Sequence, residues 1–237
     1  HIHDLDYYPT KTTTCIQYDL DDLFERGFRT KNGSIRTPQS IQSYATLATI
    51  IFQTNQNEQH GGQAIPAFDF FMAEGVRKTF RKHLKTLTEF YIEVEGKEPG
   101  TEALKKIEEK AYAMTRKDTH QAMEGFIHNL NTMHSRGGNQ VVFSSINYGT
   151  DTSPEGRMVI EELLKATIEG LGTRGEVPVF PIQIFKVKDG VSYSEEDYKK
   201  AMENFEAALE GKMEFQAPNF DLFLKACRTT AKALFPN

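Results

Sequence analysis

The sequence has little of what disulfide-rich and membrane proteins require. Its 237 residues include two cysteines and no tryptophan, and two cysteines cannot cross-link a chain of this length into a small secreted scaffold. Hydrophobic residues make up 38% of the chain. The longest strongly apolar stretch, residues 45–52, is far shorter than the roughly 18 residues of a membrane span. We therefore expect a soluble, cytoplasmic protein without a membrane partner.

An excess of positive charge is also missing. The chain has 28 Lys and Arg against 33 Asp and Glu, which gives a formal net charge of -5. Proteins that wrap duplex nucleic acid carry a basic surface, so no nucleic-acid partner is expected. Paired-cysteine metal spacing, a Ser-His-Asp order and the kinase motifs are absent as well, and the sequence predicts no metal site.

Strand-like and helical segments alternate along the chain. Runs rich in β-branched and aromatic residues predict strands at residues 12–19, 139–147 and 178–187. Start and stop signals, such as Thr37-Pro38 before the first helix and Gly61-Gly62 after it, predict helices at residues 39–59, 66–95, 101–134, 154–170, 195–210 and 219–234. Helices between the strands favour parallel packing and the α/β class. Three strands are too few to close a barrel, so the domain is expected to be incomplete.

Two histidines stand at the start of the sequence. His1 and His3 alternate with other residues and are followed by Asp4 and Asp6. In an extended segment the histidines share one side and the aspartates the other. The spacing is loosely compatible with a metal site, although an aspartate-capped turn explains it more simply. We favour proton transfer or substrate hydrogen bonding by a histidine over metal binding.

The two cysteines differ in their surroundings. Cys15 lies in a predicted strand directly after three threonines, which is an unusually polar approach for a core strand. Lone cysteines are mostly small buried residues, and the threonines are the feature that favours a functional role. Cys227 lies in a helical pattern and is expected to pack. Nothing in the sequence requires a disulfide between them.

The segment 144–153 joins a predicted strand to a predicted helix. Its Gly, Ser and Thr residues would place free amides and a helix dipole around an anion such as phosphate. The same residues suit an ordinary strand-to-helix turn with a capping side chain. The pattern alone leaves both interpretations open.

Several motifs in one order resemble a known family, the anaerobic (class III) ribonucleoside-triphosphate reductases. The run HIHDLDY at residues 1–7, followed by Cys15, is the specific part of the likeness. Supporting segments follow in the same order, at residues 19–20, 27–28, 38–41, 61–62, 139–143, 149–150 and 179–181. The likeness covers residues 1–237 as a single segment of the catalytic domain.

The resemblance implies a fold and an activity. The fold is a helix-rich α/β barrel of ten strands, built from two five-stranded halves, of which this chain is the first. The activity is the reduction of ribonucleoside triphosphates to deoxyribonucleoside triphosphates for DNA synthesis by thiyl and glycyl radicals. Cys15 matches the strand cysteine that faces the substrate ribose. The candidate substrate-binding residues are His1, His3, Ser144, Ser145 and Asn147.

The resemblance also implies parts and partners beyond this segment. The nucleotide-binding cone, the thiyl cysteine, the radical glycine and a zinc site are expected outside residues 1–237, so the segment alone is expected to be inactive. A radical-SAM activating enzyme, ATP and deoxynucleotide effectors, and a second copy of the chain are the expected partners. Residue 14 is threonine, where the resemblance leads us to expect asparagine in some relatives, and we expect one hydrogen bond to substrate to differ accordingly.

Two other interpretations compete with this one. Pyruvate formate-lyase relatives are also glycyl-radical enzymes, but they use adjacent cysteines, which Thr14-Cys15 does not offer. A non-catalytic nucleotide-binding or dimerisation module would use a long helix, such as the one predicted at residues 101–134, as its interface.

Overall fold

The computed structural model describes residues 15–30, 33–57, 61–134, 140–188 and 190–192. The predicted helices at residues 195–210 and 219–234 lie outside these ranges, as do His1, His3 and Cys227.

A parallel sheet of four short strands organises the described part of the chain. Its order is β1 (Ile16–Gln17), β4 (Gln63–Ile65), β5 (Ser144–Tyr148) and β6 (Ile182–Phe185). Each neighbouring pair is parallel, and the order in the sheet follows the order in the chain. Helices provide every crossover, as parallel neighbours require. The helix-rich α/β class predicted from the sequence is confirmed.

Four helices were predicted within the described ranges, and all four are present. They are α2 (Ile41–Gln56), α3 (Phe68–Glu95), α4 (Thr101–Thr132) and α5 (Pro154–Glu169). The predicted start of the first was wrong, because Ser40 and not Thr37 is its N-cap. The Ser40 hydroxyl accepts the Ser43 N–H, and the Ser43 hydroxyl accepts the Ser40 N–H, which forms a capping box. Thr37 instead donates to the carbonyl of Glu25.

Several short elements have no counterpart among the predictions. They are α1 (Leu20–Arg26), the antiparallel hairpin of β2 (Phe28–Thr30) and β3 (Gly33–Ile35), and strand β4. Gly61-Gly62 predicts the end of a helix, and in the structure strand β4 begins directly after it. A three-residue strand is too short to show the two-residue period by which strands are recognised.

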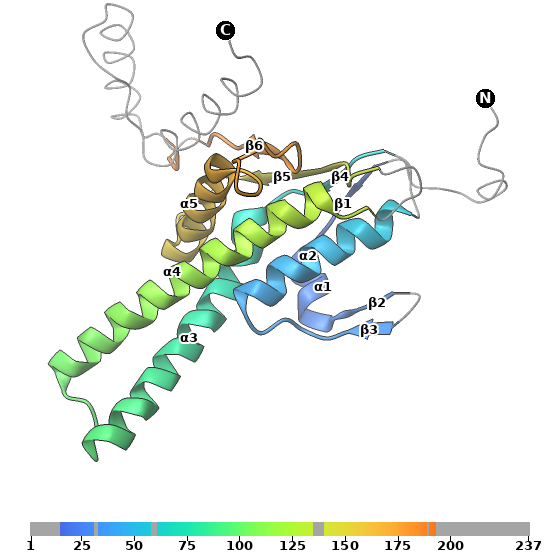
Figure 1. Ribbon diagram of the computed structural model, residues 1–237. Helices are drawn as coiled ribbons and strands as arrows, with labels where there is room; N and C mark the ends of the chain where they lie inside the picture. The colour runs from blue at the N-terminus through green and yellow to red at the C-terminus, as the bar shows by residue number, and fades with distance from the viewer. Residues whose placement is uncertain (1–14, 31–32, 58–60, 135–139, 189, 193–237) are drawn as a thin grey trace, which may run out of the picture.

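The helices lie on one side of the sheet (Figure 1). The sheet contributes Ile65, Ile146 and Tyr148 to the core, each with no exposed surface. Phe52 of α2 and Phe68 of α3 are equally buried, and all five belong to one hydrophobic cluster. The opposite side of the sheet is therefore the one that these helices leave uncovered.

Helices α3 and α4 form a long antiparallel hairpin that extends beyond the sheet (Figure 1). Gly96 ends α3 in the left-handed conformation, with φ of 66°. Near the tip, Phe90 and Val94 expose 62% and 63% of their surfaces. No helix in the described ranges has the length and apolar character needed to cross a membrane.

Candidate functional site

Cys15 lies directly before β1 on the uncovered side of the sheet. Its neighbour Ile16 packs against the core, and strand side chains alternate in direction. Cys15 and Gln17 therefore point away from the helices, and the Cys15 thiol is free and exposed. The Ile16 N–H donates to the carbonyl of Gly62 at 3.2 Å, which fixes the start of β1 against β4.

The strand register shows which residues share this uncovered face. Gln17 pairs with Ala64, Ala64 with Ser145, and Ser145 with Ile182. Asn147 lies two residues further along β5 and on the same face as Ser145. The structure thus places Cys15, Ser145 and Asn147, all of them candidates from the sequence, on one face of the sheet.

Ser144 faces the other way. It has no exposed surface, and its hydroxyl donates to the carbonyl of Val142 at 3.1 Å. Strand alternation explains the separation, because neighbouring residues of a strand cannot share a face. The structure therefore does not bring Ser144 together with Cys15, and its hydroxyl is engaged within the chain.

Asn147 has an unused hydrogen-bond acceptor. Its Oδ1 atom is shielded from solvent and has no hydrogen-bond partner among the residues that the structure describes. Buried polar atoms are nearly always paired, so this oxygen is suited to accept a hydrogen bond from a ligand. By contrast, the Ser145 hydroxyl donates to the carbonyl of Gln63 at 3.4 Å, a long bond that a better acceptor can replace.

The backbone N–H groups of the loop after β5 already bind a carboxylate of the chain itself. The backbone N–H groups of Gly149, Thr150 and Asp151 donate to Oδ2 of Asp69 at 2.8, 3.1 and 3.0 Å. Asp69 lies in the first turn of α3 and has no exposed surface. These amides are therefore not free to bind phosphate, and the structure supports the interpretation as a capped turn.

Backbone N–H groups at the start of α5 are likewise paired with side-chain oxygens of the chain. The Ser153 hydroxyl accepts the Gly156 N–H at 3.1 Å, and the Ser153 N–H donates to Oδ1 of Asp151 at 2.8 Å. A Cβ atom at Gly156 would lie 2.1 Å from Oδ2 of Asp151, so a glycine is needed there. Together with Asp69, these contacts hold the carboxyl end of β5, and with it Asn147, in a fixed position.

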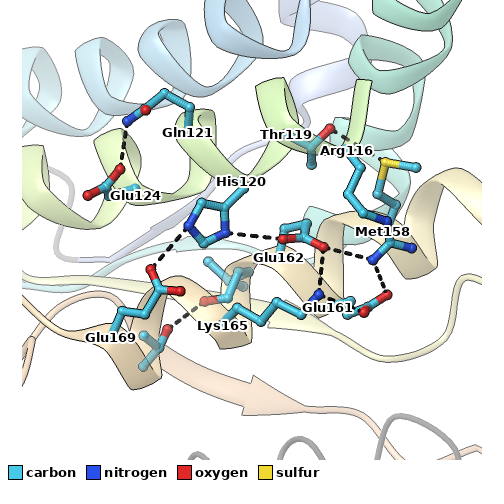
Figure 2. A network of polar contacts seen from close by, with 12 residues as sticks. Arg116, Thr119, His120, Gln121, Glu124, Met158, Glu161, Glu162, Lys165 and Glu169 are labelled. Atoms are coloured by element: carbon cyan, nitrogen blue, oxygen red, sulfur yellow. Dashed lines mark hydrogen bonds and ion pairs between the residues drawn. The ribbon is translucent and has the colours of Figure 1, made fainter. Parts of the chain in front are cut away.

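A second cluster of polar side chains joins α4 to α5 (Figure 2). At its centre is Glu162, whose side chain is 4% exposed. Glu162 contacts Arg116 Nη1 at 2.8 Å, Lys165 Nζ at 3.0 Å and His120 Nδ1 at 3.1 Å. His120 also contacts Glu169 through Nε2 at 3.1 Å. Both carboxylates that contact His120 come from α5, whereas His120 and Arg116 come from α4.

The cluster pairs its two cations, Arg116 and Lys165, with carboxylates of α5. Burial lowers the pKa of Arg116, but hydrogen bonds to Glu161 and Tyr112 outweigh burial and raise it. Burial raises the pKa of Glu161, and hydrogen bonds from Lys165 and Arg116 outweigh it and lower the pKa. Arg116 and Glu161 therefore keep their charges at neutral pH. We interpret the cluster as a brace between two helices and not as a reactive site.

Within the described ranges, no group of three or more His, Cys, Asp or Glu side chains is arranged to hold a metal ion. The chemistry available on the uncovered face is that of a free thiol with hydroxyl and amide groups beside it. Gln17 and Phe143 also lie on this face, and the sequence did not predict them as site residues. The two-residue alternation through Cys15 and Ser145 was the signal that could have identified them.

Comparison with known proteins identifies the family. The family model for anaerobic ribonucleoside-triphosphate reductase matches residues 1–237. The chain is similar to the anaerobic ribonucleoside-triphosphate reductases of Enterobacteria phage T4, with 29% identity over 238 residues, and of Haemophilus influenzae, with 28% identity over 239 residues. All of this chain is covered in both alignments, which span 34% and 29% of the two relatives. The Escherichia coli enzyme of that name is 28% identical, with 29% of its length covered. The chain therefore belongs to the anaerobic ribonucleoside-triphosphate reductase family.

Proposed function

We propose that this chain is part of the catalytic domain of an enzyme that reduces ribonucleoside triphosphates to deoxyribonucleoside triphosphates, and that Cys15 faces the substrate ribose. The observation that carries the proposal is the free, exposed thiol of Cys15. It lies on the uncovered face of the parallel sheet together with Ser145 and Asn147, in a chain of this family.

The sheet supports a barrel as the complete fold. Doubly wound sheets carry helices on both faces, whereas barrels keep their helices outside and their strands in sequential order. Here the order follows the chain and the helices lie on one side (Figure 1). In a closed barrel the uncovered face becomes the interior. Four strands are too few to close one, and we propose that they belong to the first half of a ten-stranded barrel.

The reaction defines what the uncovered face must provide. Replacing the C2' hydroxyl of ribose by hydrogen releases water and consumes two electrons and two protons. A thiol beside the sugar supplies one electron with one proton as a hydrogen atom and becomes a thiyl radical, and Cys15 is the thiol on this face. We assign the second electron and proton, and the return of Cys15 to the thiol, to an external reductant such as formate or a dithiol protein. The Asn147 Oδ1 atom, which lacks a partner among the described residues, accepts a hydrogen bond from a ribose hydroxyl. The Ser145 hydroxyl donates a hydrogen bond to the same sugar or accepts one from it.

The remaining parts of the machinery are assigned to other segments. The glycyl radical supplies the unpaired electron that starts the reaction when it is present. We place the radical glycine, the thiyl cysteine, the zinc site and the nucleotide-binding cone outside residues 1–237. His1 and His3 are proposed to contact substrate. A radical-SAM activating enzyme, ATP and deoxynucleotide effectors and a second subunit are the proposed partners, in the cytoplasm.

The test is the Cys15→Ser variant of the complete reductase, with Cys227→Ser as the matched control. Cys15→Ser is expected to bind substrate and to form the glycyl radical at the wild-type yield by EPR, but to make no deoxynucleotide. Cys227→Ser is expected to remain active. Deoxynucleotide formation by Cys15→Ser within an order of magnitude of wild type would overturn the proposal.

A further inference from the structure

Phe143 has a large apolar side chain and lies level with Cys15 across the sheet, on the same uncovered face. It exposes 53% of its surface, although the residues on either side of it, Val142 and Ser144, are completely buried. The Gln63 N–H donates to the Phe143 carbonyl at 3.2 Å, and the Ile16 N–H donates to the Gly62 carbonyl at 3.2 Å. Gly62 therefore lies between Cys15 and Phe143 across the sheet, on the uncovered face.

The ring of Phe143 leans towards the strand that carries Cys15. A Cβ atom at Gly62 would lie 3.2 Å from Cε1 and 3.3 Å from Cδ1 of Phe143, so the ring lies over this glycine. Neighbouring strands are about 4.8 Å apart, which places the Cα atoms of Cys15 and Phe143 about 10 Å apart. A ring over the middle strand covers much of that gap. The backbone at Gly62 does not adopt a positive φ, so the constraint on a side chain at this position is its close approach to the ring.

A second aromatic ring supports this position from behind. The ring of Phe180 meets that of Phe143 at an interplanar angle of 65°, with centroids 5.3 Å apart. Phe180 is 9% exposed and belongs to the core cluster. The edge-to-face arrangement is a favourable one for an aromatic pair. Phe143 is thus anchored on one side and open on the other.

Asn131 of α4 fixes Phe180. Its Oδ1 atom accepts the N–H groups of Val179 and Phe180 at 2.8 and 3.0 Å. Its Nδ2 atom donates to the Phe180 carbonyl at 2.5 Å and to the Ile127 carbonyl at 2.7 Å. Both polar atoms of a single side chain are therefore used to hold one short segment and the ring it carries.

We propose that Phe143 is a substrate-contact residue of the reductase and that Asn131 is its positioning residue. The exposed ring forms an apolar wall beside the Cys15 thiol, against which the C–H face of the ribose packs, and it keeps water away from the thiol. Asn131 sets the place of the ring through Phe180, and Gly62 leaves the room that the ring needs. This inference rests on the proposed function, because it requires the ribose to lie at Cys15.

The experiment compares variants of the complete reductase in steady-state kinetics. Phe143→Ala is expected to raise KM for the ribonucleoside triphosphate about tenfold, since it removes the apolar contact. Gly62→Ala shifts the ring without removing it and is expected to raise KM by a smaller factor. Phe143→Tyr keeps the ring and is expected to leave KM within about twofold of wild type. All three are expected to form the glycyl radical at the wild-type yield.

A double-variant cycle tests the role of Asn131. Asn131→Ala is expected to raise KM, and Asn131→Ala combined with Phe143→Ala is expected to raise it no further than Phe143→Ala alone, because both act through one ring. Additive effects would overturn the positioning role, and a lower melting temperature with unchanged KM would overturn the substrate contact. If Cys15→Ser is inactive while Phe143→Ala keeps the wild-type KM, this inference fails and the proposed function stands. If Cys15→Ser is active, the proposed function itself fails.

Discussion

Asp69 offers the sharpest test of how the structure holds the end of β5. Its Oδ2 atom accepts three consecutive N–H groups, from Gly149, Thr150 and Asp151, and no water reaches the carboxylate. A hydrogen bond to a charged group contributes about 1.5–3 kcal/mol. One oxygen shared by three donors gives less than three independent bonds, because such effects are not additive. We therefore expect Asp69→Ala to lower the free energy of unfolding by about 4 kcal/mol.

The matched variant is Asp69→Asn, which keeps an oxygen acceptor but loses the charge. Neutral hydrogen bonds contribute roughly half as much as charged ones, so the expected loss is about 2 kcal/mol. Asp22→Asn is the control, because the Asp22 carboxylate is exposed and pairs with Arg26 of its own helix, while its backbone N–H, which the substitution leaves in place, donates to Asp19. Its effect should stay within about 0.5 kcal/mol.

The assay is urea unfolding, combined with hydrogen exchange of the amides of residues 149–151. Asp69→Ala should remove exchange protection at these amides first, because they lose their acceptor. A loss of stability below about 1 kcal/mol would refute the reasoning. So would stabilisation of the wild-type chain by inorganic phosphate through these amides, since they are occupied by the carboxylate.

Two further predictions concern the helix layer. Burial raises the pKa of Glu161, but hydrogen bonds from Lys165 and Arg116 outweigh burial and lower that pKa. A lowered carboxyl pKa stabilises the fold above the ordinary value of about 4.3, and this stabilisation is lost as the pH falls through the folded value. In urea unfolding, Glu161→Gln should therefore have a lower midpoint than wild type at pH 7, and the difference between the two midpoints should become smaller in acid. A difference that does not change with pH would contradict this. A Cβ at Gly75 would lie 2.9 Å from the ring of Tyr44, so Gly75→Ala should cost about 2 kcal/mol. Gly125→Ala, with open space around its Cβ, should instead stabilise α4 by about 0.5 kcal/mol in the same assay, and equal effects would refute the packing argument.

The long helices were predictable because their signals are local. Ser153 before Pro154, and Gly96 after Glu95, mark ends that the structure reproduces. Strand β4 was not predictable, because its three residues acquire their conformation from pairing with β1 and β5. The α/β class could be predicted from the alternation of strands and helices along the chain, whereas the presence of β4 could not.

The candidate site was predictable only in part. Cys15 and the residues of β5 were identified, but Ser144 was grouped with Ser145 although alternation separates them. The contact between Asp69 and residues 149–151 joins parts of the chain about 80 residues apart, and no local pattern reports it. The same holds for the approach of Phe143 to Gly62, which depends on how two strands are paired.

The central claim is that Cys15 lies beside the bound ribose. The most direct measurement is the alkylation rate of Cys15 in the complete reductase, followed by mass spectrometry at increasing concentrations of ribonucleoside triphosphate. The account predicts that substrate slows alkylation of this exposed thiol, with half of the protection reached at the concentration of half-maximal substrate binding. A rate for Cys15 that stays unchanged at saturating substrate would contradict it.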